Sequence, residues 1–202
     1  MIKELRFRRG TGKFLGSTIV RFEPGVNLLV GPNGSGKSTV LVSAEAASKE
    51  PKTHAIKLTK KVKARRFDSE QMNPRTVNFM DAMGDPTMFA LAWRGKSKSH
   101  GQALVPILTT MMDGEIQKQL KARRTGESIT MMLDEPESGL DHDALKEFVK
   151  VVNKYRKKVQ FIIATHSVWL WKNLDANIIV LGHEKGYAKR VMREHEEAMR
   201  AV

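Results

Sequence analysis

One run of residues has the glycine pattern and the basic side chain of a phosphate-binding loop. It fills G-x-x-x-x-G-K-[ST] between an apolar segment at 27–30 and a segment of helical composition at 39–47. In such a loop the glycines leave backbone N–H groups open to phosphate oxygens, Lys37 neutralises the β- and γ-phosphates, and Ser38 can hold Mg²⁺. The predicted nucleotide-binding set is Gly31, Pro32, Asn33, Gly34, Ser35, Gly36, Lys37, Ser38 and Thr39.

A pair of acids, Asp134 and Glu135, follows the apolar segment 129–133. Ligands of α/β proteins bind at the carboxyl ends of parallel strands, where this pair would lie. Adjacent strand residues face opposite ways, so the two carboxylates have different tasks. We expect Asp134 to orient Mg²⁺ and Glu135 to polarise the water that attacks a γ-phosphate. An isolated Asp-Glu pair is equally typical of a helix N-terminus, but the phosphate-binding loop favours the catalytic interpretation.

A histidine, His166, ends the next apolar strand, within Ala-Thr-His-Ser at 164–167. From a strand tip it can reach the γ-phosphate and fix the attacking water. Taken singly it is more typical of a surface or helix-capping histidine. The order of loop, acid pair and histidine favours a catalytic role.

The elements that would position these residues alternate between strands and helices. Apolar alternation predicts strands at 3–9, 17–31 with a turn at Pro24-Gly25, a strand pair within 53–67, and strands at 129–137, 159–167 and 177–182. Helices are expected at 35–49, 101–124 and 142–158, with a short charged helix at 186–202. This pattern indicates an α/β fold with a mainly parallel sheet and an antiparallel strand group on the N-terminal side.

Composition limits the class of protein. The 202 residues are 41% hydrophobic, contain no cysteine and include no apolar run of membrane-spanning length. We therefore expect a cytoplasmic protein with no membrane segment of its own. It should form one domain over 1–202, comprising a basic sheet lobe with the loop (1–80), a short helical region (81–128) and the remainder (129–202).

Basic residues are concentrated in the N-terminal part of the chain. The formal net charge is +13, and residues 1–80 hold 16 basic against 6 acidic side chains. The densest basic stretch is residues 49–67, which contain a single acid, Glu50. Its basic residues are Lys49, Lys52, Lys57, Lys60, Lys61, Lys63, Arg65 and Arg66. Such a cluster fits nucleic-acid phosphates, an acidic protein partner or a solvated surface equally well.

Taken in order, these motifs resemble those of ABC ATPases over residues 5–182. The match places Walker A at 31–38, Walker B at 129–134 with the catalytic-type Glu135, the D-loop at 138–141 and the switch histidine at His166. Ser99-His100-Gly101-Gln102, directly before an apolar helical segment, is similar to the Leu-Ser-Gly-Gly-Gln signature, with His100 in place of a glycine.

The resemblance implies a single ABC-type domain that hydrolyses ATP with Mg²⁺ and forms an ATP-dependent homodimer with two nucleotides between the subunits. Ser99, Gly101, Gln102 and Asp141 would then contact nucleotide. Gln71 is the candidate for the Q-loop ligand of Mg²⁺, although Glu70 or Ser69 fits the same position.

Within that family the chain is similar to the SMC and RecF-like genome-maintenance branch and to short stand-alone bacterial and phage ATPases. This likeness is carried by Gly25, Asn27, Gly31 and Asn33. The chain differs from SMC proteins, which carry a long coiled coil between the Q-loop and the signature, because here only 28 positions separate Gln71 from Ser99. The expected function is ATP hydrolysis coupled to nucleic acid, in a repair or defence-like complex. The alternative is the nucleotide-binding subunit of a membrane transporter, and phosphoryl transfer to a small molecule is disfavoured because Glu135 and His166 indicate water as acceptor.

Overall fold

The central element is a five-stranded parallel sheet. The computed structural model describes residues 1–7, 18–49, 56–58, 62–68, 112–138, 140–182 and 184–201. Within these residues the sheet has the order β5-β6-β7-β3-β8. Its strands are β3 (Val26–Val30), β5 (Val62–Asp68), β6 (Ser128–Asp134), β7 (Val159–Ala164) and β8 (Ala176–Val180). The predicted α/β class with a mainly parallel sheet is confirmed.

A smaller antiparallel sheet lies against one side of the molecule, as the N-terminal pattern predicts. It has the order β2-β1-β4 and consists of β1 (Ile2–Arg6), β2 (Ile19–Arg21) and β4 (Ile56–Leu58).

The prediction of a strand pair within 53–67 is wrong in its pairing. The two strands exist, but β4 pairs with β1, whereas β5 runs parallel to β6 from Val62 to Asp68. The physical reason is that β5 contributes to both cores: the buried Val62 lies in one hydrophobic cluster and the partly buried Phe67 packs against the other. A strand with apolar contacts on both of its faces fits the central parallel sheet.

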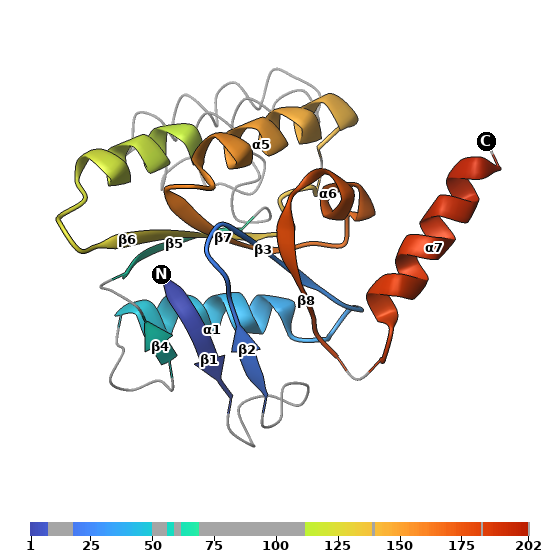
Figure 1. Cartoon of the computed structure of the whole chain (residues 1–202), viewed down its shortest axis with the longest axis horizontal. Coiled ribbons are helices and arrows are strands. Elements are labelled where there is room, and N and C mark those ends of the chain that lie inside the picture. The colour runs from blue at the N-terminus through green and yellow to red at the C-terminus, as the bar shows by residue number, and fades with distance from the viewer. Residues whose placement is uncertain are drawn as a thin grey trace, which may run out of the picture.

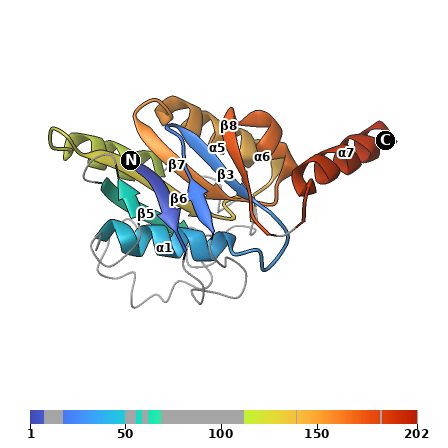
Figure 2. The ribbon, with the colours of Figure 1, turned by 60° about the horizontal axis from the view of Figure 1, so that its bottom comes forward.

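Helices cover both faces of the central sheet (Figures 1 and 2). α1 (Lys37–Lys49) and the small sheet cover one face. On the other face lie α5 (His142–Tyr155), α6 (Val168–Asn173) and the helical residues 112–121. Each face of the sheet has its own hydrophobic core, and successive strand side chains point into one core and then the other. Leu28 lies in the core on the α5 side and Leu29 in the core on the α1 side, and both are fully buried.

The C-terminal helix α7 (Tyr187–Arg200) stands off from the body and touches it through α6 (Figure 1). None of its described residues is fully buried. This element confirms the predicted charged helix. The sequence did not predict α6 (Val168–Asn173), which has only six residues and follows the N-cap Ser167. No helix in the described part of the chain is long and apolar enough to cross a membrane.

A buried glutamine, Gln160, joins the two sheets at the end of the molecule away from the phosphate-binding loop. Its side chain accepts hydrogen bonds from the Ile2 backbone N–H (3.0 Å) and the Thr130 hydroxyl (2.9 Å). It donates to the carbonyl oxygens of Ile2 (2.8 Å) and Glu23 (3.1 Å). Four backbone or hydroxyl groups from separate strands and a loop therefore depend on one side chain, in a residue that is 1% exposed.

Replacing Gln160 with leucine should lower the free energy of unfolding by about 3 kcal/mol, because it leaves buried backbone groups of Ile2 without partners. Urea unfolding followed by circular dichroism measures this change. Gln117→Leu is the control, since the hydrogen bond of Gln117 to Asp113 is exposed, and it should change stability by less than about 0.5 kcal/mol. Equal effects of the two substitutions would contradict the structural role of Gln160.

Candidate nucleotide site

The carboxyl ends of three neighbouring strands meet at one edge of the sheet. Ala164 of β7 is in register with Leu29 of β3 on one side and with Asp134 of β6 on the other. The phosphate-binding loop follows β3, Glu135 follows β6, and His166 comes two residues after β7 ends. The register of the sheet therefore brings together the three motifs that are far apart in the chain.

The loop at 31–36 wraps tightly in front of α1. A side chain at position 31 would put its Cβ 2.4 Å from the Leu181 carbonyl oxygen, so only glycine fits there. The Lys37 Nζ folds back and donates to the carbonyl oxygens of Gly31 (3.1 Å) and Pro32 (3.2 Å). The loop is thus closed by its own lysine, and its buried Ser35 hydroxyl has no hydrogen-bond partner among the described residues.

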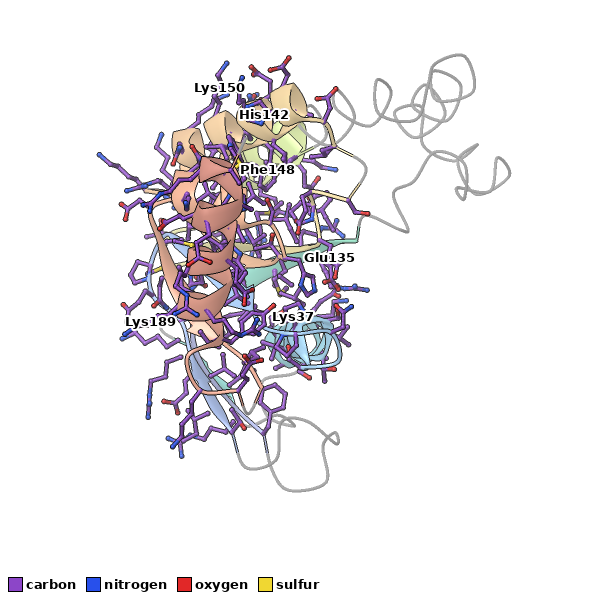
Figure 3. The ribbon with its side chains drawn as sticks, turned by 90° about the vertical axis from the view of Figure 1, so that its right-hand side faces the viewer. Lys37, Glu135, His142, Phe148, Lys150 and Lys189 are labelled. Atoms are coloured by element: carbon purple, nitrogen blue, oxygen red, sulfur yellow. The ribbon has the colours of Figure 1, made fainter. Side chains whose placement is uncertain are left out.

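Lys37 is a buried cation among carboxylates. Only 6% of the residue is exposed, and this burial lowers the pKa of its ammonium group, while the negative charges of Glu135, Asp134 and Glu137 act in the opposite direction. Figure 3 shows Lys37 at the start of α1, facing the same edge as Glu135. A polyphosphate bound here would favour the charged lysine further.

Two potential magnesium ligands already lie within hydrogen-bonding distance. The Ser38 hydroxyl donates to Asp134 Oδ1 over 3.1 Å, joining the start of α1 to the end of β6. No cluster of three or more histidine or acidic side chains suited to a metal occurs among the described residues. A hydroxyl beside a single carboxylate fits Mg²⁺, which takes few protein ligands and completes its shell with water and phosphate oxygens. Ser38 and Asp134 would hold the ion.

The predicted base and switch residues also lie together. His166 Nε2 is 3.5 Å from Glu135 Oε1, and both side chains are partly exposed. Glu135 has a left-handed backbone with φ +44°, the one non-glycine residue with positive φ in the described part of the chain. Its N–H donates to the Ala164 carbonyl oxygen over 2.9 Å. With this backbone conformation the Glu135 carboxylate leaves the direction of β6 and lies beside His166, just after the end of β7.

The remaining predicted residues divide into three groups. Asp141 is the N-cap of α5, where its carboxylate accepts from the Ala144 N–H over 2.9 Å. Asn33, Gly34 and Thr39 lie at the solvent-facing side of the loop and of the first turn of α1. Four residues fall outside the described part of the chain: Gln71, Ser99, Gly101 and Gln102. For Gln71, the structure describes only the strand before it, which ends at Asp68 in register with Asp134.

Sequence reasoning missed Glu137, the second acid of the Asp-Glu-Pro-Glu run. Its Oε1 accepts three hydrogen bonds from the tip that carries His166, namely from Thr165 Oγ1 (2.7 Å), His166 N–H (2.8 Å) and Ser167 N–H (3.2 Å). An acid two residues beyond Glu135 was the available signal, but the sequence alone does not reveal its partners.

A glycine-rich loop, an acid pair and a histidine at one edge of a parallel sheet define a P-loop nucleotide-binding site. A family model described as "AAA domain, putative AbiEii toxin, Type IV TA system" matches residues 119–170. The zinc import ATP-binding protein ZnuC 2 of Aliivibrio fischeri is 29% identical over 171 residues, which cover 76% of this chain and 67% of that protein.

Solved structures show the same fold. A nucleotide-free ATP-binding cassette from an ABC transporter aligns with a TM-score of 0.52 at 15% identity, covering 90% of this chain and 86% of the other. The SMC head domain from Thermotoga maritima aligns with a TM-score of 0.52 at 17% identity, covering 88% and 94%. The chain has the P-loop fold of ABC-type ATPases, and the resemblance seen in its motifs is confirmed.

Replacing Lys37 with alanine should weaken binding of ATP by at least about 100-fold, because the substitution removes the cation that faces the phosphates. Isothermal titration calorimetry with Mg²⁺ and ATP measures the affinity. Lys49→Ala is the matched control at the opposite end of α1, where the lysine is exposed and pairs with Glu45 over 3.0 Å. Retention of ATP affinity by the Lys37 variant would contradict this site.

Proposed function

We propose that this chain is a Mg²⁺-dependent ATPase that works as an ATP-dependent homodimer. The observation that carries the proposal is the pairing of Ser38 with Asp134 beside the pairing of Glu135 with His166, all at one edge of the sheet. The first pair suits a metal–phosphate complex, and the second suits a water molecule attacking it. Lys37 supplies the positive charge between them.

Hydrolysis at this site requires a base and a fixed water. Glu135 accepts a proton from the water while the water oxygen bonds to the γ-phosphorus, and the bond from that phosphorus to the β–γ bridging oxygen breaks. ADP and inorganic phosphate are the products. Lys37 stabilises the charge that develops on the phosphoryl oxygens, and His166 orients the water or the γ-phosphate. Bound Mg²⁺ would neutralise the phosphate oxygens.

The dimer rests on the ABC-type motif order. Ser99, Gly101 and Gln102 would contact the γ-phosphate bound to the other subunit, and the segment 138–141 with Asp141 would lie at the same interface. The ABC-type fold supports this arrangement.

Glu135→Gln should trap the ATP-bound dimer, because the amide cannot accept the proton from water while every nucleotide contact remains. Light scattering coupled to size exclusion, with Mg²⁺ and ATP, should then give twice the monomer mass. Glu147→Gln on the exposed face of α5 is the control, and it should behave like the unaltered protein. A Glu135 variant that binds ATP and stays monomeric would exclude the dimer.

For the partner, we propose nucleic acid, on the basis of the charge surplus of residues 1–80. Four described members of the basic stretch are already in ion pairs: Lys49 with Glu45 (3.0 Å), Lys63 with Glu127 (3.1 Å), Arg65 with Glu115 (3.3 Å) and Arg66 with Glu45 (3.3 Å). Lys63 also donates to the Ala122 carbonyl oxygen. Lys60 and Lys61 belong to the same basic stretch and lie outside the described residues; they are the two lysines chosen for the test.

The combined Lys60→Ser and Lys61→Ser substitution should weaken DNA or RNA binding and reduce the slope of affinity against salt by about one unit for each lysine that neutralises a phosphate. Fluorescence anisotropy over a salt series measures both quantities. Lys146→Ser on α5 is the control with an exposed lysine elsewhere. Absence of nucleic-acid binding, together with an ATPase rate unaffected by double-stranded DNA, single-stranded DNA and RNA, would contradict this partner.

A transporter subunit is the second candidate, favoured by the 29% identity to the zinc import ATP-binding protein of Aliivibrio fischeri. The same ATPase assay separates the two, because a transporter subunit has no reason to respond to nucleic acid.

A further inference from the structure

The tip of β7 that carries His166 is held by a single carboxylate oxygen. Oε1 of Glu137 receives the Thr165 hydroxyl, the His166 N–H and the Ser167 N–H at 2.7, 2.8 and 3.2 Å. Two of these three donors are backbone groups on either side of the His166 side chain. A carboxylate that accepts several N–H groups makes charge-assisted bonds, which are shorter and stronger than neutral ones.

The tip is fixed further by its own polar side chains. The Thr165 hydroxyl, besides donating to Glu137, accepts from the Ser167 N–H over 3.0 Å. The Ser167 hydroxyl accepts from the Leu170 N–H over 3.3 Å and thereby caps α6. Loss of the Glu137 carboxylate would therefore remove the acceptor of the His166 N–H, whereas the Ser167 N–H would keep the Thr165 hydroxyl and α6 would keep its Ser167 cap.

The backbone of Glu137 belongs to the turn after β6 that also contains Glu135. The Ser138 N–H donates to the Glu135 carbonyl oxygen (3.0 Å), and the Leu140 N–H donates to the Glu137 carbonyl oxygen (3.0 Å). Glu137 thus belongs to the same closed turn as the strained Glu135, while its side chain reaches the neighbouring strand tip. Glu135 Oε1 and His166 Nε2 lie 3.5 Å apart, and the turn and the tip that carry them are joined by the Glu137 side chain in addition to the bond from the Glu135 N–H to the Ala164 carbonyl oxygen.

We propose that Glu137 is a positioning residue for ATP hydrolysis, one that holds the His166 backbone at the distance from Glu135 that an attacking water needs. The inference rests on the proposed ATPase function. Glu137 itself does not touch nucleotide in this assignment. It acts through the orientation of His166 and Glu135, so its loss should reduce turnover and leave nucleotide affinity nearly unchanged.

Charge and hydrogen bonding at Glu137 can be separated experimentally. Its second oxygen, Oε2, is buried and has no hydrogen-bond partner among the described residues, and its negative charge acts on Lys37. Glutamine keeps one oxygen that can accept from the tip, whereas alanine keeps none. Recovery of activity in Glu137→Gln relative to Glu137→Ala would therefore assign the effect to the hydrogen bonds.

The test is steady-state ATP hydrolysis by the full chain with three substitutions and one control. Glu137→Ala should lower kcat by about 30-fold with KM within about threefold, because small misplacement of catalytic groups costs one to two orders of magnitude. Glu137→Gln should recover to within about fivefold of the unaltered protein, and Thr165→Val, which removes one donor, should lower kcat by about threefold. Glu147→Ala, at an exposed glutamate of α5, should have no effect.

Amide hydrogen exchange read by mass spectrometry gives an independent measure. The peptide containing His166 and Ser167 should exchange faster in Glu137→Ala than in the unaltered protein and in Glu147→Ala. Unchanged kcat in both Glu137 variants, or an equal loss of kcat and ATP affinity, would overturn the inference. If Glu137→Ala does not fold, Glu137→Gln and Thr165→Val decide the matter through the same kcat and KM. An unaltered protein with no ATP turnover would contradict the ATPase proposal instead.

Discussion

The parallel register of three strands is the constraint on which the candidate site depends. β3, β7 and β6 are adjacent, and Leu29, Ala164 and Asp134 lie side by side where these strands end. The local sequence determines the conformation of the loop, of the acid pair and of the histidine segment. Their positions relative to one another depend on the strand register. If the register of β6 shifted by one residue relative to β7, every β6 side chain would move to the opposite face of the sheet. Asp134 would then point away from Ser38. The buried apolar side chains on both faces of the sheet oppose such a slip.

The site places polar and charged groups where burial works against them. Lys37 is almost fully covered, and the two carbonyl oxygens of its own loop, with three carboxylates nearby, offset part of the cost of its desolvation. The loop is closed by bonds of its own, from the Lys37 ammonium group to Gly31 and Pro32 and from the Ser35 N–H to Pro32, so Lys37 is held in place without a bound phosphate. Binding can therefore use groups that folding has already positioned, which reduces the entropy lost when the nucleotide is ordered.

Much of the candidate site could be predicted from sequence, because few structures other than a nucleotide site combine these residue types at this spacing. The loop pattern, the acids after an apolar strand and the histidine after the next one fix which strand ends must meet. The partner of β5 could not be predicted, since nothing local to 53–67 distinguishes pairing with β4 from pairing with β6; packing of Val62 and Phe67 on opposite faces decides it. The contacts of Glu137 were equally hidden, because they join residues 28 to 30 positions apart through a tertiary turn.

The left-handed backbone of Glu135 has a consequence for how this site can change over evolution. A non-glycine residue at φ +44° costs about 1 kcal/mol relative to glycine. Glycine would relieve that strain and at the same time delete the carboxylate. In the proposed ATPase, a more stable fold and faster turnover therefore favour different residues at this single position.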